Sequence, residues 1–118
     1  MLLSKEFKFD SAHNLIEYHG KCEKLHGHTY RLRVTIEGVP GSDGMILDYG
    51  ILKKTVTEKI ISRVDHQYLN EIVPQSTTEN LVMWMWSELE KPLLSPAYHL
   101  YEIKLWETET SFATYRGK

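Results

Sequence analysis

The sequence contains little cysteine, no long apolar run and no excess of positive charge. Cys22 is the only cysteine among 118 residues, so it is a buried filler, a metal ligand or a reactive thiol rather than half of an internal disulfide. No apolar segment approaches a membrane span, and the amino terminus lacks an extended apolar region behind a basic start, so we expect a cytoplasmic location. The formal net charge of -2, with scattered Lys and Arg, argues against a nucleic-acid-binding protein.

The length and composition of the chain indicate one ordinary globular unit. A chain of 118 residues suits one domain, and 42% hydrophobic with 25% charged residues is typical of a folded protein rather than a disordered one. The cluster of Pro, Gly, Ser and Asp at residues 40–44 is short enough to be a loop, and no repeat or linker divides the chain. We therefore predict a single domain over residues 1–118.

Three histidines are predicted to lie on the inward faces of two strands. Residues 3–13 alternate between apolar and polar side chains, with His13 on the apolar face. Residues 26–36 alternate in the same way, with His26 and His28 on the face that carries the large apolar side chains. Three imidazoles from neighbouring strands would supply three corners of a tetrahedron and leave the fourth open, as in a catalytic zinc site. The alternative is a set of hydrogen-bonded core histidines, or surface residues at a strand start.

Two further positions carry side chains that suit catalysis or binding. Asp65 stands beside His66 just after the first predicted helix, where the pair is either catalytic or only stabilised by the helix dipole and local backbone bonds. Glu107 ends the apolar face of the strand that contains Tyr101, Ile103 and Leu105. An inward carboxylate needs a donor, which would be a ligand with two parallel N–H groups or, in the alternative, a salt bridge at the rim of the sheet.

The order of the predicted elements indicates an α+β fold. One helix follows Asp48, a suitable N-cap, and a second follows the capping-box spacing of Ser76 and Glu79. The first helix is expected to bury the stripe Leu52, Val56, Ile60 and Val64, and the second to bury Leu81, Val82, Met85, Trp86 and Leu89. A last short strand is predicted within residues 110–116. The order strand, strand, helix, helix, strand, strand predicts a four-stranded antiparallel sheet with both helices on one side.

Five short motifs together resemble one family of enzymes. They are F-x-F-D-S-A-H at Phe7 to His13, C-x-x-x-H-G-H at Cys22 to His28, D-H-Q-Y-L-N at Asp65 to Asn70, T-T-E-N-L at Thr77 to Leu81, and W-E-T at Trp106 to Thr108. In this order they resemble the family of 6-pyruvoyltetrahydropterin synthase and 6-carboxytetrahydropterin synthase, over essentially the whole chain. The short loops look most like the 6-carboxytetrahydropterin synthase branch, which serves queuosine and related 7-deazapurine synthesis.

The resemblance implies a fold, an assembly and roles for the site residues. It implies the tunnelling fold, in which trimers close their sheets into a barrel and two trimers stack as a homohexamer with active sites between subunits. It also implies one zinc per subunit held by His13, His26 and His28. The remaining roles that it implies are Cys22 as the proton-abstracting base, Asp65 and His66 as its assistants, and Glu107 as the anchor of the pterin ring.

The activity implied is the conversion of 7,8-dihydroneopterin triphosphate to 6-carboxy-5,6,7,8-tetrahydropterin, acetaldehyde and triphosphate. One alternative is 6-pyruvoyltetrahydropterin synthase, which eliminates triphosphate but keeps the side chain. Another is cleavage of a dihydroneopterin side chain for folate synthesis, because some relatives use a glutamate near the cysteine position and Glu23 follows Cys22 here. A zinc-stabilised binding module without activity is the remaining alternative, and it has no need for a thiol and an Asp-His pair beside an open histidine site.

Overall fold

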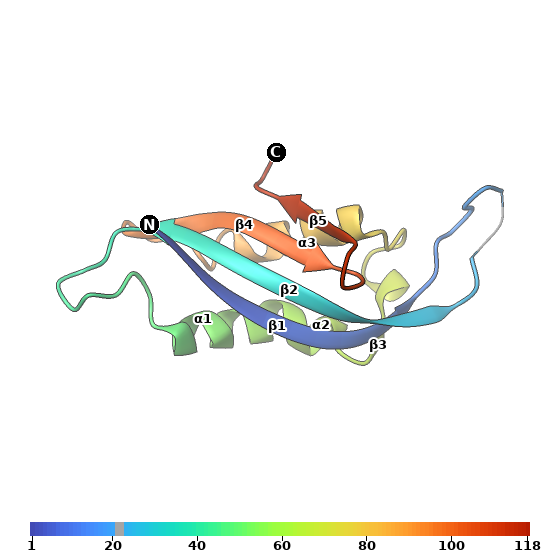
Figure 1. Cartoon of the computed structure of the whole chain (residues 1–118), viewed down its shortest axis with the longest axis horizontal. Helices are drawn as coiled ribbons and strands as arrows, with labels where there is room; N and C mark the ends of the chain where they lie inside the picture. The colour runs from blue at the N-terminus through green and yellow to red at the C-terminus, as the bar shows by residue number, and fades with distance from the viewer. Residues whose placement is uncertain (21–22) are drawn as a thin grey trace.

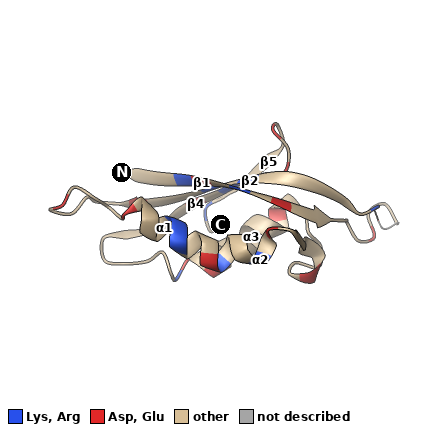
Figure 2. Ribbon diagram, turned by 90° about the horizontal axis from the view of Figure 1, so that it is seen from below, with Lys and Arg blue, Asp and Glu red and all other residues tan. Residues whose placement is uncertain are grey.

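A twisted sheet forms one layer of the protein, and all of its longer helices pack on one face of that sheet (Figure 1, Figure 2). The structure is a computed structural model that describes residues 1–20 and 23–118. The molecule is elongated, with a longest extent of 55 Å. This length follows from the first two strands, which run side by side along the long axis (Figure 1).

The sheet has five strands in the order β3-β1-β2-β4-β5. Their bounds are β1 Leu2–His13, β2 His26–Gly38, β3 Gln67–Tyr68, β4 Tyr98–Trp106 and β5 Phe112–Tyr115. The four longer strands pair in antiparallel fashion, which confirms the predicted α+β sheet. The fifth, β3, pairs in parallel with the end of β1. A two-residue strand has no alternating pattern to predict it, so the sheet has one strand more than the four that were predicted.

Helical residues 49–64 cross the sheet as three consecutive segments: α1 Tyr49–Val56, the π-helical η1 Thr57–Ile61 and α2 Ser62–Val64. The Asp48 carboxylate accepts the Gly50 N–H at 2.6 Å and caps the first turn, as predicted. The predicted stripe is fully buried along its whole length: Leu52, Val56, Ile60 and Val64. In a regular α-helix, a residue four positions further along is displaced by about 40° around the helix axis, so a stripe spaced by four would wind away from the sheet. The wider π turn slows this rotation and keeps the stripe facing the sheet.

The second long helix, α3, spans Thr78–Leu89 and starts one residue later than the capping-box spacing predicts. Its N-cap is Thr77, whose hydroxyl accepts the Asn80 N–H at 3.1 Å. The prediction that Ser76 caps this helix is therefore wrong, and Ser76 is instead buried beneath the sheet's histidines. A single 3-10 turn, η2 Leu69–Glu71, precedes it. No helix within residues 1–20 and 23–118 is both long and apolar enough to cross a membrane.

The core lies between the inner face of the sheet and the helices. Alternation along β2 buries Tyr30, Leu32, Val34 and Ile36, as the sequence pattern predicts. On β4 the pattern shifts, because β4 has a bulge opposite Thr35 and Ile36 of β2: Thr35 pairs with Glu102, and Ile36 pairs with Leu100. Leu100 is consequently buried and the expected inward residue Tyr101 is only partly buried.

Candidate metal centre and active site

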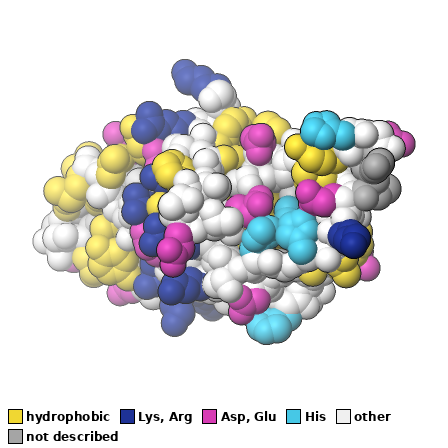
Figure 3. Space-filling view, turned by 45° about the vertical axis from the view of Figure 1, so that its right-hand side comes forward, with side chains coloured by type: hydrophobic (Ala, Val, Ile, Leu, Met, Phe, Trp, Pro, Cys, Tyr) yellow, Lys and Arg dark blue, Asp and Glu magenta, His cyan; other side chains and the backbone are white. Residues whose placement is uncertain are grey.

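The three predicted histidines meet at the end of the β1–β2 pair. His13 and His26 are register partners across the two strands, and His28 follows on the same face of β2. The ligand atoms of the three rings all lie within 4.8 Å of one another. His13 is buried while the other two are partly exposed, so the group opens to the surface on one side. In Figure 3 a group of histidine side chains lies near the centre of the molecular face, and further histidines lie apart from it.

Hydrogen bonds fix the orientation of two of these rings. The Nδ1 atom of His13 donates to the Ser76 carbonyl at 2.8 Å, and that of His26 donates to the Lys24 carbonyl at 2.9 Å. Because a carbonyl oxygen only accepts, each Nδ1 carries a proton, and in the neutral ring the Nε2 atom then presents a lone pair. The two Nε2 atoms lie 3.1 Å apart. Lone pairs that face each other so closely favour a cation between them, so the donor set fits a metal ion.

Two buried atoms beside this group have no hydrogen-bond partner among the described residues: Nε2 of His28 and the hydroxyl of Tyr30. Burial lowers the pKa of His28, with further lowering from His13 and His26 and an opposing effect of Glu107. The ring is therefore neutral at neutral pH and keeps a lone pair for a ligand. Burial also raises the pKa of Tyr30, so its hydroxyl stays protonated as a donor.

Glu107 joins the histidine group from the end of β4. Its Oε1 lies 3.2 Å from Nε2 of His28, without the alignment of a hydrogen bond. Its Oε2 accepts the Thr78 hydroxyl at 2.9 Å. Thr78 is the first residue of α3, so one helix end holds the carboxylate in place. The structure thus brings Glu107 together with the three histidines, and Thr78 is a site residue that the sequence analysis missed within T-T-E-N-L.

A second feature that the sequence did not predict is a hydrogen-bond network, through Ser76 and Asn70, that holds the His13 ring in place. The Ser76 hydroxyl lies 3.2 Å from Nδ1 of His13 and donates to Oδ1 of Asn70 at 2.8 Å. The Asn70 amide nitrogen donates to the carbonyls of Asn14 and Pro74, at 2.7 and 2.9 Å. Its Oδ1 also accepts the Asn14 N–H at 3.1 Å, so the Asn70 amide is fully paired. The only sequence feature that pointed to Asn70 was its position as the last residue of the D-H-Q-Y-L-N motif.

Asp65 and His66 form a separate group at the β3 edge of the sheet. Nδ1 of His66 lies 3.0 Å from Oδ1 of Asp65, and the same carboxylate oxygen accepts the Asp10 N–H at 3.0 Å. That backbone bond is the main reason why the pKa of Asp65 is lowered, and His66 lowers it further. His66 has a φ of 57° and a side chain that is 77% exposed. Such a backbone conformation is uncommon outside glycine and marks the residue as a functional candidate.

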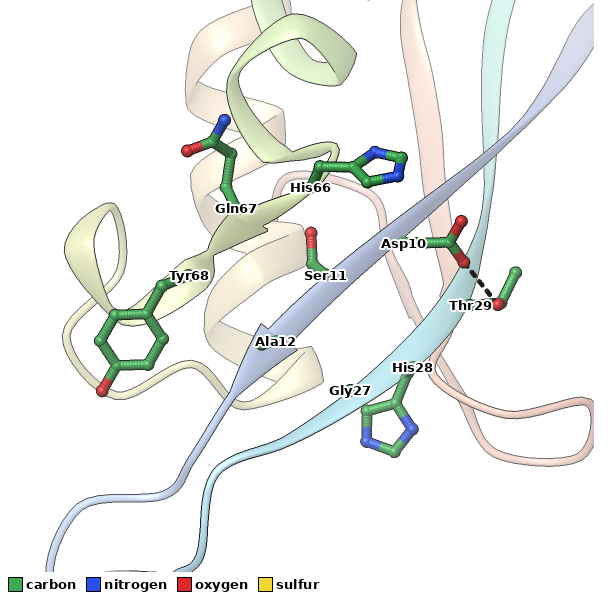
Figure 4. Close-up of a pocket in the computed structure, with 9 residues that line it drawn as sticks. All are labelled: Asp10, Ser11, Ala12, Gly27, His28, Thr29, His66, Gln67 and Tyr68. Atoms are coloured by element: carbon green, nitrogen blue, oxygen red, sulfur yellow. Dashed lines mark hydrogen bonds between the residues drawn. The ribbon is translucent and has the colours of Figure 1, made fainter.

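A shallow hollow of about 570 Å³ borders this edge (Figure 4). His66 and Gln67 lie on one side of β1 in Figure 4, and the ring of His28 extends from β2 on the other. Within the described residues, Asp65 and His66 form a metal-ligand grouping with Asp10 and do not join the three histidines. A single chain therefore leaves the predicted catalytic pair apart from the predicted metal site.

The predicted base, Cys22, lies outside the described residues. Its neighbour Glu23 is described, and Oε1 of Glu23 lies 3.5 Å from Nδ1 of His26. Glu23 therefore lies next to the histidine group. The roles predicted for Cys22 and for the Asp-His pair remain predictions.

An antiparallel sheet with helices on one face, three converging histidines and an inward glutamate defines a small α+β protein with a candidate mononuclear metal site. Comparison with known proteins gives the family. The model of the 6-pyruvoyl tetrahydropterin synthase family matches residues 2–118, and the chain belongs to this family.

Named relatives divide between two activities. The chain is 35% identical to 6-pyruvoyl tetrahydrobiopterin synthase of Dictyostelium discoideum, covering 100% of this chain and 97% of that protein. It is 36% identical to 6-carboxy-5,6,7,8-tetrahydropterin synthase of Synechocystis sp., covering 97% and 92%. The structure of Caenorhabditis elegans 6-pyruvoyl tetrahydropterin synthase superimposes with a TM-score of 0.84 at 25% identity, covering 100% and 96%. The predicted tunnelling fold is thereby confirmed, and the chain is a member of a family of tetrahydropterin synthases.

Proposed function

We propose that this protein converts 7,8-dihydroneopterin triphosphate and water to 6-carboxy-5,6,7,8-tetrahydropterin, acetaldehyde and triphosphate, in the synthesis of queuosine and related 7-deazapurines. The observation that carries the proposal is the convergence of three histidine rings, in which the Nε2 atoms of His13 and His26 lie 3.1 Å apart and Nε2 of His28 lies 3.2 Å from the Glu107 carboxylate. This arrangement places a metal-binding donor set next to a group that can hold a pterin. The relative from Synechocystis sp. supports the carboxy branch.

His13, His26 and His28 would hold one zinc ion per subunit. Three neutral imidazoles with an open fourth position are the donor set of catalytic zinc. Bound zinc would supply Lewis-acid polarisation of the oxygens on the substrate side chain. The residues around it hold the ligands in the required tautomer, because the Ser76 and Lys24 carbonyls keep the protons on Nδ1.

Glu107 would bind the pterin ring. A pterin edge presents neighbouring N–H groups, and a carboxylate accepts two parallel N–H bonds. The Thr78 hydroxyl already holds Oε2 of Glu107, so the carboxylate is oriented before the ligand arrives. A pterin held by Glu107 would lie beside His28, with the substrate side chain directed toward the histidine group.

Cys22 would remove a proton from the substrate carbon next to the polarised oxygen, with His66 and Asp65 assisting. Asp65 accepts from the Asp10 backbone and from His66, which orients the imidazole. The pair lies at the sheet edge and is exposed, so we propose that it serves the site of a neighbouring subunit. A homohexamer built as a dimer of trimers, with intersubunit active sites, would bring these groups together.

The leading alternative is 6-pyruvoyltetrahydropterin synthase, which the relative from Dictyostelium discoideum supports. It shares the substrate, the metal and the base, and it differs in keeping the side chain. Cleavage of a dihydroneopterin side chain for folate is favoured only by the place of Glu23 beside His26. A binding module without activity would leave the polar groups at the open site without a catalytic role.

The test is mass-spectrometric identification of products after the zinc-loaded protein is incubated with 7,8-dihydroneopterin triphosphate. We expect 6-carboxytetrahydropterin and acetaldehyde in equal amounts. Formation of 6-pyruvoyltetrahydropterin alone would move the protein to the pyruvoyl branch and keep the site. Turnover only of dephosphorylated dihydroneopterin would support the folate-type activity. No turnover of either substrate, despite bound zinc, would contradict the proposal.

A further inference from the structure

The face of the sheet that points away from the helices carries positive charges in unfavourable positions. The β1–β2 register places Lys8 directly opposite Arg31, and the β2–β4 register places Arg33 opposite Lys104. Like charges that face each other across an antiparallel pair destabilise a sheet. In Figure 3, Lys and Arg side chains form a stripe across the molecule beside the histidines. Two consecutive like-charged pairs indicate a role other than sheet stability.

Trp106 holds these cations close together. The Arg31 guanidinium stacks on its ring at 3.8 Å from the centroid, and the Lys104 ammonium lies 4.8 Å from it. The indole is 6% exposed although it lies on the outer face, because the cationic side chains cover it. Stacking fixes the plane of the Arg31 fork, so little conformational freedom remains to be lost when a ligand binds.

The Arg31 guanidinium has an N–H donor that no acceptor among the described residues satisfies. Arg33 forms an ion pair with Glu6 at 2.8 Å, but within residues 1–20 and 23–118 neither Arg31 nor Lys104 lies within 4.0 Å of a carboxylate. Nε of Arg31 is buried and has no hydrogen-bond acceptor among the described residues. A buried, unpaired charged donor is costly, so an anion that reached it would gain a strong bidentate contact.

A hollow of about 330 Å³ opens beside this guanidinium. Lys8 and the hydroxyl-bearing Thr108 line it together with Arg31, and Glu109 contributes one opposing charge. Asp10 lies on the same face but its Oδ1 accepts the Thr29 hydroxyl at 2.5 Å. The cationic side chains around the hollow therefore outnumber the carboxylates that are available to pair with them. The hollow consequently favours an anion with several negative oxygens.

We propose that this hollow binds a phosphate-type oxyanion, with Arg31 as the bidentate ligand and Lys8 as a further cationic contact. The site lies on the outer face of the sheet, on the other side from the buried core residues of β2. In a barrel with its helices outside, this face would line the interior and stay open to small anions. The ligand would be either a free oligophosphate or the triphosphate of a bound substrate, which share the same oxygen geometry.

The test uses inorganic tripolyphosphate, titrated at constant ionic strength into the full-length, metal-loaded protein. The indole N–H signal of Trp106, assigned with Trp106→Phe, is followed by heteronuclear NMR, and released metal is measured in the same samples. We expect a saturable shift of this signal without metal release. Arg31→Ala should weaken binding roughly tenfold or more, because hydrogen bonds to charged groups are lost. The affinity of Arg31→Lys for tripolyphosphate should lie between those of the parent chain and Arg31→Ala, because lysine keeps the positive charge but lacks the planar guanidinium fork.

Lys53→Ala is the matched control, because Lys53 is an exposed cation on α1 at the helical side. It should leave tripolyphosphate binding unchanged. A raised KM for 7,8-dihydroneopterin triphosphate in Arg31→Ala would assign the site to the substrate's triphosphate, and an unchanged KM would assign it to a free oligophosphate. No saturable shift, equal binding by Arg31→Ala, or a shift that tracks metal release would overturn the proposal. The binding arm needs no turnover, so its result is independent of the proposed activity.

Discussion

Asn70→Asp isolates the support that lies behind the candidate metal ligand His13. The substitution keeps the size of the side chain and the oxygen that accepts from Ser76 and from the Asn14 N–H. It removes the amide nitrogen that donates to the carbonyls of Asn14 and Pro74, at 2.7 and 2.9 Å. A carboxylate oxygen then faces two carbonyl oxygens, so the turn before α3 shifts and carries Ser76 with it.

The expected effect has two parts. Two lost hydrogen bonds lower the free energy of unfolding by about 1–3 kcal/mol. Because Ser76 fixes the tautomer and the ring orientation of His13, we also expect the affinity for zinc to fall roughly tenfold to a hundredfold, the range found for residues that orient metal ligands. The second effect is the specific one, since a purely structural role predicts only the first.

The assay is competition for zinc against a chromogenic chelator, alongside the melting temperature of the metal-free chain. Asn80→Asp is the matched control, because Asn80 makes one comparable donor bond, to the Gln75 carbonyl at 2.9 Å, outside this chain of contacts. The control should keep nearly full zinc affinity. If Asn70→Asp melts earlier yet binds zinc within about twofold of Asn80→Asp, the role of Asn70 in positioning His13 is refuted and Asn70 only stabilises the fold.

Three other perturbations test the remaining roles. Cys22→Ala should keep stoichiometric zinc while turnover falls roughly a hundredfold or more, as for loss of a general base; loss of the metal would show that Cys22 is a ligand. Glu107→Gln should weaken pterin binding, measured by fluorescence titration, about tenfold with an unchanged melting temperature; equal affinity would remove Glu107 from recognition. The lowered pKa of Asp65 predicts that its charge stabilises the fold above the ordinary carboxyl pKa and that this contribution is lost as pH falls through the folded value. Metal-free Asp65→Asn should thus be less stable than the parent chain at neutral pH and equal to it in strong acid, and a difference that persisted in acid would contradict this.

Several features followed from the sequence alone because they depend on local periodicity. Alternation placed His26 and His28 on the buried face of β2, and it placed His13 on the inner face of β1. Spacing by four placed the stripe of the first helix, and Asp48 was recognised as its cap. The motifs named the family, which the match over residues 2–118 confirms.

Other features needed the tertiary structure because they depend on contacts between distant segments. The capping-box spacing favoured Ser76 among three adjacent hydroxyl residues, and only the packing of α3 assigns the cap to Thr77. Ser76 and Thr78 are thereby left to hold His13 and Glu107, which are 63 and 29 residues away along the chain. The β4 bulge was likewise invisible, since it arises from pairing with β2.

The sequence by itself determined that the three histidines share the inner face of two strands, because a side chain's direction within a strand is fixed by the backbone repeat. It also supplied the zinc-type donor set and the family. Only the tertiary structure decided that the Nε2 atoms of His13 and His26 lie 3.1 Å apart and that Glu107 lies beside His28. It also decided that Asp65 and His66 lie apart from the histidines, at the sheet edge. Those outcomes depend on how two strands and a helix end converge, and no local pattern encodes a distance between segments that are far apart in the chain.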